Sequence, residues 1–277
     1  MPRAKIQIPR DILQRLYWEE YKSPPKIAKL FNCDPITVRT RMRELGILFR
    51  SSSGARMRYR KFDFSGDLIE KAYLIGFRLG DLNVYQTRES SELIIARCNT
   101  TQIVQVNLMK NLFAKYGRIT ISKGKYSTNV NCYLNKTFDF LLPKHEEVPL
   151  WIRDDVKASW AFIAGYTDAE GNFILNQTRA RFKIDSYDIG ILRWITMWLR
   201  EQNINVKFRL IYKKRDLRPD GLYYNSDLWR VNINEASSLL RFIRFLAPFI
   251  RHKTRYYGMQ VCKKNIERRV KNGTIKN

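Results

Sequence analysis

Two apolar segments of the chain repeat one pattern at a fixed interval. One reads Leu-Ile-Gly-Phe-Arg-Leu-Gly-Asp and ends at Asp81, and the other reads Ile-Ala-Gly-Tyr-Thr-Asp-Ala-Glu and ends at Glu170; the interval of 89 residues also separates Gly76 from Gly165. Glycine inside a helix costs about 1 kcal/mol relative to alanine, so it marks a place where another backbone comes close. A carboxylate at a helix C-terminus is disfavoured by about 0.3–1 kcal/mol. The pattern predicts two helices packed together, with Asp81 and Glu170 side by side at one end.

Two carboxylates placed side by side repel each other, and a divalent cation would relieve that repulsion. The chain has two histidines and four cysteines without CxxC spacing, which excludes a zinc site on spacing grounds. Carboxylate oxygens are hard ligands that suit Mg²⁺. The sequence therefore predicts a Mg²⁺ site held by Asp81 and Glu170, and reduced, mostly buried cysteines.

The two segments together resemble the LAGLIDADG homing endonucleases, in the form that carries two motifs on one chain. The second copy, residues 163–171, is a close match. In the first copy, Leu79 stands where the motif has its first acid and Leu82 where it has its final glycine. The resemblance covers about residues 67–265. It implies a metal-dependent endonuclease that cuts both strands of double-stranded DNA across the minor groove, leaves short 3′ overhangs and serves intron or intein mobility.

The resemblance also implies roles for individual residues. It makes Asp81 and Glu170 the catalytic metal ligands, and it leaves Asp168 as a helix-end hydrogen-bonding residue without a ligand role. It further implies a polar residue at the end of the second strand of each half and a basic residue near the bottom of the site. Local matches place these on Asn99, Ser186, Lys144 and Lys253. For the two lysines, the alternative is a plain contact with DNA phosphate.

The charge of the chain favours a polyanionic partner. Its 277 residues include 51 Lys and Arg against 26 Asp and Glu, a formal charge of +25, and the 13% aromatic content argues against a disordered basic tail. Ribosomal and membrane-surface proteins share this charge. Because the chain has no apolar run of about 18 residues and no signal-peptide core at its N-terminus, we expect a soluble, cytoplasmic monomer without a membrane partner.

Residues 1–48 are predicted to form a helix-turn-helix domain. Expected helices cover residues 9–21, residues 24–31 with Ser23 as cap, and residues 35–46 with Asp34 as cap. The third helix turns Val38, Met42 and Leu45 inward and Thr37, Arg39, Thr40 and Arg43 outward. Arginine and threonine can reach base edges and phosphates in a DNA major groove. The alternative is the solvated surface of a small helical cap.

Residues 49–66 are expected to be a basic linker that follows the phosphate backbone between two DNA-binding units. Five basic residues and no acid lie between residues 49 and 61. The predicted DNA contacts of the linker are Arg56, Arg58 and Arg60.

The rest of the chain is predicted to be two halves of one α+β fold, residues 67–150 and 151–265, followed by a basic tail at 266–277. Each half has the order α-β-β-α-β-β-α about a pseudo-two-fold axis. In the first half, the expected strands are 83–88, 92–98, 118–123 and 126–134, and the helices after the motif helix are 101–116 and 136–142. In the second half, the motif helix is 160–169, the strands are 172–177, 180–185, 207–214 and 223–233, and the later helices are 189–202 and 235–249.

Basic residues recur among apolar ones at near-alternating positions in these strands, which predicts a concave basic face on both sheets laid along duplex DNA. The alternative is an ordinary solvated face with mixed charge. The expected DNA contacts are Arg88, Arg97, Lys123, Arg179, Arg181, Lys183, Lys207, Arg209, Lys213 and Arg230.

The leading functional hypothesis is a Mg²⁺-dependent, site-specific DNA endonuclease. One alternative is a non-cleaving transcriptional regulator built on a decayed endonuclease core, which the weak first motif motivates. A second is an RNA maturase that binds its own intron RNA through the same basic surfaces. Retention of both carboxylates argues against the regulator.

Overall fold

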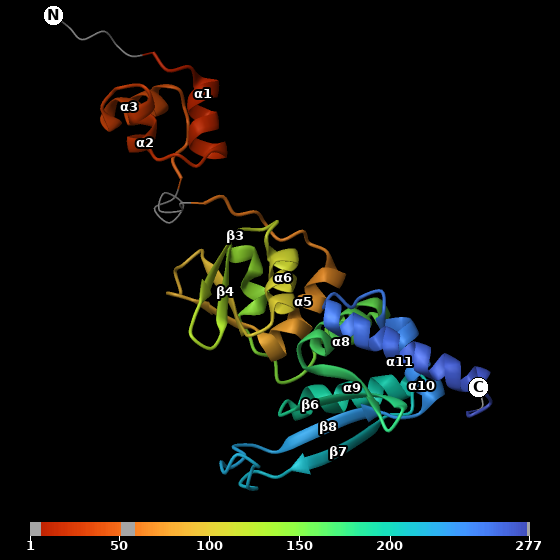
Figure 1. The fold of residues 1–277 in the computed structure, drawn as a ribbon. Coiled ribbons are helices and arrows are strands. Elements are labelled where there is room, and N and C mark those ends of the chain that lie inside the picture. Colours follow the sequence, from red (N-terminus) through yellow and green to blue (C-terminus); the bar gives the residue numbers. More distant parts are fainter. Residues whose placement is uncertain (1–6, 51–58, 276–277) are drawn as a thin grey trace, which may run out of the picture.

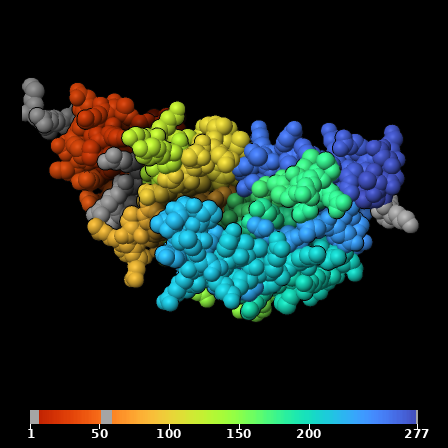
Figure 2. Space-filling model, turned by 60° about the horizontal axis from the view of Figure 1, so that its bottom comes forward, coloured from red at the N-terminus to blue at the C-terminus, as the bar shows by residue number. Residues whose placement is uncertain are grey.

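The computed structural model describes residues 7–50 and 59–275. It contains an N-terminal helical unit followed by two halves, each built on a four-stranded antiparallel sheet (Figure 1). The predicted α+β fold is confirmed. In the space-filling view, the second half, coloured green to blue, forms a continuous surface beside the first half in orange and yellow (Figure 2).

The N-terminal unit consists of short helices around a core of its own. They are α1 (Arg10–Gln14), the π-helix η1 (Arg15–Glu19), α2 (Pro24–Leu30) and α3 (Pro35–Glu44). Asp34 caps α3 as expected, because its side chain accepts a hydrogen bond from the Ile36 amide at 2.7 Å. Ser23 precedes α2 but makes no side-chain cap, contrary to prediction. The buried residues of this unit are Ile8, Leu13, Leu16, Tyr17, Ile27, Ala28, Val38, Met42 and Ile47.

The first half begins with a helix that ends on its carboxylate. Its elements are α5 (Leu68–Asp81), β1 (Asn83–Gln86), β2 (Ile94–Thr100), α6 (Ile103–Phe113), β3 (Arg118–Lys123), β4 (Thr128–Leu134) and the 3-10 helix η2 (Lys136–Leu141). The sheet order is β1-β2-β4-β3, so each of the two hairpins forms one side of the sheet, with β2 and β4 in the centre and β1 and β3 at the edges. Asp67 caps α5 through its side chain, which accepts from the amides of Ile69 and Glu70.

The second half repeats this order, with a longer connection between its last two strands and an additional helix at each end. Its elements are α7 (Leu150–Arg153), α8 (Val156–Glu170), β5 (Gly171–Asn176), β6 (Arg179–Ser186), α9 (Ile189–Glu201), β7 (Lys207–Tyr212), β8 (Leu228–Ile233), α10 (Ala236–Leu246) and α11 (Lys253–Lys271). The sheet order is β5-β6-β8-β7, with α9 and α10 on one side of it (Figure 1). The expected insert lies between β7 and β8, where Leu217 and Tyr223 form a bridge. Helix α11 continues past residue 265 and buries Ile266.

Helices α5 and α8 pack backbone to backbone, as the glycines predict. A Cβ atom added at Gly76 would lie 2.1 Å from the carbonyl oxygen of Phe162, and one added at Gly165 would lie 2.0 Å from that of Tyr73. Real Cβ atoms do not approach other atoms this closely, so only glycine fits at either position. Most of the second helix is buried, from Ala158 to Ala169. This pair therefore forms the centre of the fold and fixes how the two halves meet.

Candidate active site

The close contact of α5 and α8 brings their final residues together. A Cβ atom at Gly80, one residue before Asp81, would lie 2.6 Å from Cβ of Ala169 and 2.8 Å from Oε1 of Glu170. The Glu170 carboxylate therefore lies against the last turn of α5. Asp81 and Glu170 are both partly buried. The predicted pair of carboxylates is thus placed at one end of the two helices.

Asp81 is held by a side chain that the sequence analysis missed. Gln105 of α6 is buried, and its Nε2 donates a hydrogen bond to Oδ2 of Asp81 at 2.7 Å. Burial, and then the negative charge of Glu170, raise the pKa of Asp81 from 3.8 to about 7. The hydrogen bond from Gln105 and the charge of Arg255 act in the opposite direction on this pKa. Without a cation, Asp81 is therefore only partly ionised near neutral pH.

Glu170 is in a similarly unfavourable electrostatic environment. Burial, and then the charge of Asp188, raise its pKa, whereas the charges of Arg255 and Lys144 lower it. Lys144 is exposed in the segment between η2 and α7. Its charge thus acts on Glu170, and its role as the basic residue of the first half stays a prediction.

Arg255 is the main cation of α11 at this site, and the sequence analysis missed it. Its charge lowers the pKa of Asp81, Asp168 and Glu170, whereas the expected residue Lys253 lies exposed at the first position of the helix. The Nε atom of Arg255 is buried and has no hydrogen-bond partner among the described residues. The sequence did contain an indication of a nearby negative charge. A cation in the first turn of a helix meets the positive end of the helix dipole, which is unfavourable unless a carboxylate lies close to it.

Asp168 makes the hydrogen bonds expected of a helix-end residue. Its Oδ2 accepts from the Tyr73 hydroxyl at 2.6 Å and from the amides of Arg251 and His252 at 2.7 and 3.0 Å. Burial raises the pKa of Asp168 to about 6. These bonds attach the start of α11, and with it Arg255, to the central helix pair.

The two residues by which the first motif departs from its pattern lie in the core. Leu79 is 2% exposed and Leu82 is 4% exposed, and both belong to the main hydrophobic cluster. The substitutions therefore change packing below the site and leave the position of Asp81 intact.

The two polar residues expected at the strand ends differ in exposure and in hydrogen-bond partners. Asn99 is exposed on β2, where its Nδ2 donates to Oδ1 of Asn129 at 3.0 Å. Ser186 is buried and exchanges hydrogen bonds with Asp188. Strand register makes Asp185 the counterpart of Asn99, because Asn99 is two residues beyond the partner of Asn83 and Asp185 is two beyond the partner of Asn172. By register, the counterpart of Asn99 in the second half is therefore Asp185, one residue before the predicted Ser186.

Asp81 and Glu170 suit a Mg²⁺ ion that also binds a phosphate group of a substrate. Among the described residues, no group of three or more His, Cys, Asp and Glu side chains could hold a metal ion by itself. Mg²⁺ keeps several waters and commonly uses one or two carboxylates together with substrate phosphates. Burial, and then the charge of Glu170, raise the pKa of Asp81, so ionising both carboxylates is unfavourable unless a cation is bound. Asp81 and Glu170 are therefore suited to a divalent cation that also contacts a substrate.

Removal of the Asp81 charge should change how stability depends on pH. Because the folded-state pKa of Asp81 lies above 3.8, its contribution to stability is fully present below pH 3.8 and is lost as the pH rises through about 7. In chelator, the melting temperature of the wild type should rise between about pH 8 and pH 6.5 by about 2–4 °C more than that of Asp81→Asn. Mg²⁺ should reduce this difference. If the melting temperatures of the two proteins change equally with pH, the pKa of Asp81 is not raised in the folded protein.

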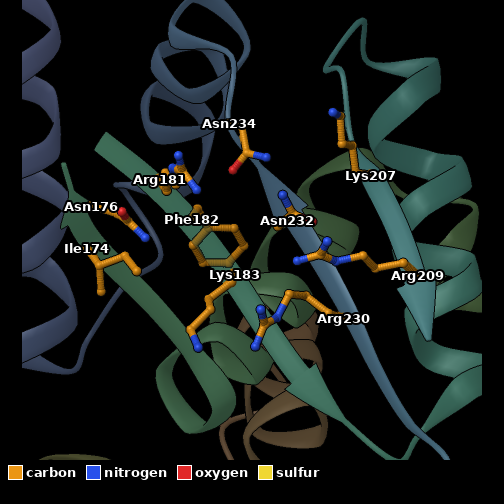
Figure 3. A pocket seen from close by; sticks show the side chains of 10 residues that line it. All are labelled: Ile174, Asn176, Arg181, Phe182, Lys183, Lys207, Arg209, Arg230, Asn232 and Asn234. Carbon is orange, nitrogen blue, oxygen red and sulfur yellow. The ribbon is translucent and has the colours of Figure 1, made fainter. Parts of the chain in front are cut away.

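The open face of the second sheet is basic, as predicted. Arg181 and Lys183 of β6, Lys207 and Arg209 of β7, and Arg230 of β8 line a hollow of about 260 Å³ with Asn176, Asn232 and Asn234 (Figure 3). Arg179 lies exposed at the start of β6, on the same face by alternation. This face is the strongest candidate for a nucleic-acid interface among the described residues.

The open face of the first sheet carries fewer of the predicted cations than that of the second. Arg97 lies on it, and the register places Arg118 on the same face; Lys123 pairs with Thr128 and alternation puts it on the opposite face, with Ile121. Arg88 lies in the turn after β1, and in the second half Lys213 lies in the turn after β7. The strands are shorter than expected, so residues counted as strand belong to turns. Arg60 stacks on Phe62, and Arg56 and Arg58 lie outside the described residues.

On the outer side of α3, Arg39, Thr40 and Arg43 are exposed and Thr37 is partly exposed. Val38 and Met42 are buried beneath them, and Leu45 is partly buried, as the spacing predicts. Arg43 lies 5.6 Å from the ring centre of Phe49. Across residues 7–50 and 59–275, no helix is long and apolar enough to span a membrane.

No family model matches the chain. It is 24% identical over 182 residues to the uncharacterized protein MJ0398 of Methanocaldococcus jannaschii, a match that spans 62% of this chain and 64%, less than two thirds, of that relative.

Among solved structures, the chain is similar to I-DmoI in complex with DNA and Ca, with 16% identity, a TM-score of 0.46 and coverage of 65% of this chain and 90% of that one. It is also similar to the homing endonuclease I-WcaI bound to its DNA recognition sequence, with 13% identity, a TM-score of 0.48 and coverage of 69% and 86%. A third is full-length DUF199/WhiA from Thermotoga maritima, with 16% identity, a TM-score of 0.45 and coverage of 75% and 63%. At these low values, a function for the chain has to rest on its own residues.

Proposed function

We propose that the protein is a Mg²⁺-dependent, site-specific endonuclease that hydrolyses phosphodiesters in double-stranded DNA. The observation that carries this proposal is the meeting of Asp81 and Glu170 at the ends of two helices that only glycine allows to pack so closely. Two partly buried like charges destabilise a fold unless a positive charge neutralises them. A divalent cation would provide that charge.

Hydrolysis of a phosphodiester needs an activated water and neutralisation of charge on the phosphoryl oxygens. Bound by the two carboxylates, Mg²⁺ would lower the pKa of water and offset the phosphate charge. Gln105 fixes the orientation of the Asp81 carboxylate through its hydrogen bond. Arg255 and Lys144 reduce the negative potential that the carboxylates would otherwise present to a phosphate. Each half contributes one carboxylate, so a monomer contains the complete pair.

We infer that DNA binding uses three parts of the chain. The open sheet faces would contact the duplex on both sides of the site, and the exposed side of α3 would enter a major groove. Arg181, Lys207 and Arg209 have no acidic partner in the described part of the chain, which leaves their charge for phosphates. The unit at residues 1–48 would then extend the recognised site beyond the two sheets.

Replacement of both Arg39 and Arg43 with alanine tests the role of α3. The double variant should bind duplex DNA about tenfold more weakly and should lower the slope of log affinity against log salt by about 1–2. Arg10→Ala, an exposed position on α1, is the control and should change neither quantity appreciably. Unchanged affinity and slope in the double variant would show that the exposed side of α3 is the solvated surface of a helical cap and does not contact DNA.

The proposed activity is tested by separating binding from cutting. Duplexes retained by the full-length protein in Ca²⁺ are recovered, bound again and then supplied with Mg²⁺. We expect tight binding in both ions and strand breaks in Mg²⁺ alone. Binding in both ions with intact DNA would leave a DNA-binding regulator, and preferential retention of structured RNA over duplex DNA would favour the maturase.

A further inference from the structure

The strand register gives a residue-by-residue correspondence between the open faces of the two sheets. Asn83 and Asn172 start the first strands and are 89 residues apart, like the glycines of α5 and α8. Asn83 pairs with Arg97, and Asn172 pairs with Lys183. Carried across both sheets, the same pairing matches Ile95 with Arg181, Asn129 with Arg230, Thr120 with Lys207 and Ser122 with Arg209. At these four positions the first sheet is neutral and the second is cationic.

The first sheet presents amides that are already oriented by cross-strand hydrogen bonds. Asn99 donates its Nδ2 to Oδ1 of Asn129 at 3.0 Å. Arg97, which corresponds by register to Lys183, is a cation in both halves; it donates its Nε to Asn131 and its Nη2 to the Tyr85 hydroxyl. The contrast between the halves therefore lies at Asn129 and Arg230. The pair of Asn99 and Asn129 therefore keeps one carbonyl oxygen and one NH₂ group available. An acceptor beside a donor is complementary to the major-groove edge of adenine, which offers the N6 amino group and the N7 acceptor.

The second sheet presents a guanidinium that is also fixed in orientation. Arg230 donates its Nε and Nη2 to the two oxygens of Asp185 at 2.5 and 2.7 Å, and Lys183 pairs with the same carboxylate at 3.1 Å. This contact uses one edge of the guanidinium and leaves the edge formed by Nη1 and Nη2. Arg230 lines the basic hollow of this sheet (Figure 3). A free guanidinium edge matches the O6 and N7 acceptors of guanine.

We propose that the two halves read half-sites of different composition. At the register positions Asn129 and Arg230, the first sheet reads adenine through Asn99 and Asn129, and the second reads guanine through Arg230, which Asp185 holds in place. Lys207 and Arg209 give the second sheet most of the attraction for phosphate. This inference rests on the proposed DNA-binding function and specifies its substrate as a duplex with one adenine-containing and one guanine-containing half-site.

The test uses the full-length protein and a library of random duplexes, selected in Ca²⁺ so that binding is measured without cutting. The retained sequences should contain a fixed adenine at one position on one side of the centre and a fixed guanine at the corresponding position on the other side. Arg230→Asn should remove one fixed guanine and weaken binding to the selected site by about tenfold or more. Asn129→Arg, its register counterpart, should replace an adenine preference with a guanine preference on the other side.

Lys123→Asn is the matched control, because it removes one positive charge from a strand on the opposite face. It should leave every base preference unchanged. The proposal is overturned if the two sides show the same base at the corresponding positions, or if Arg230→Asn weakens binding equally for all sequences. The second outcome would mean that Arg230 contacts only phosphate, and either outcome leaves the nuclease proposal standing. Failure to retain any duplex at low salt would instead overturn the proposed function itself.

Discussion

Asp81→Asn and Glu170→Gln should each lower the rate of DNA cleavage in Mg²⁺ by about 10³-fold. Each change keeps the shape of the side chain and removes one of the two negative charges that hold the cation. Affinity for the selected duplex should fall by no more than about threefold, because the sheets and α3 supply most of the contacts. Single-turnover cleavage and equilibrium binding, measured on the same protein preparations, separate the two effects.

The control for these two variants is Asp154→Asn. Asp154 is an exposed carboxylate at the end of α7 and is not one of the predicted site residues. It should cut at the wild-type rate. Wild-type cleavage by either Asp81→Asn or Glu170→Gln would show that the site lies elsewhere. A variant that loses binding together with cleavage would indicate a structural role for that carboxylate.

Gly165→Ala should destabilise the protein by about 3 kcal/mol and reduce cleavage even in the fraction that remains folded. At an unobstructed helix position, alanine would be favoured over glycine by about 1 kcal/mol. Here the added methyl group would meet the backbone oxygen of Tyr73 at 2.0 Å, so α5 and α8 must separate. Separation moves Asp81 away from Glu170. Denaturant unfolding and single-turnover cleavage report the two consequences.

Gly258→Ala provides a comparison inside α11, where the nearest atom to the added Cβ would be 3.2 Å away, on Phe173. That change should cost far less stability than Gly165→Ala. Equal stability of the two variants, or a gain at Gly165, would mean that the helix pair can open without penalty. The account of why glycine occupies this position would then be wrong.

The sequence predicted the fold well because its strongest signals are local. The period and the glycines of the motif helices were sufficient to place α5 and α8, and β3 was predicted with the bounds that it has, Arg118–Lys123. The order of elements in each half followed from the same alternation of periods. Asp81 and Glu170 were found because a carboxylate at the wrong end of a helix is costly wherever it occurs.

The remaining features of the site depend on contacts between distant segments. Gln105 is ordinary in the sequence, and only the packing of α6 against β2 and β4 places its amide on Asp81. Asp185, and not the predicted Ser186, is the register counterpart of Asn99. The loop before β6 is shorter than the loop before β2, so the counterpart can be identified only from the strand register. Counting charges along strands also failed for Lys123, since one residue of shift changes the face of a sheet.

The central claim is that two carboxylates, one from each half, direct the cutting of two DNA strands. The most direct measurement is cleavage of a selected duplex that carries a different label on each strand, resolved on a denaturing gel after addition of Mg²⁺. The account predicts one break in each strand, a few nucleotides apart, and both breaks lost in Asp81→Asn and in Glu170→Gln. A duplex that stays bound and unbroken in Mg²⁺ would contradict it.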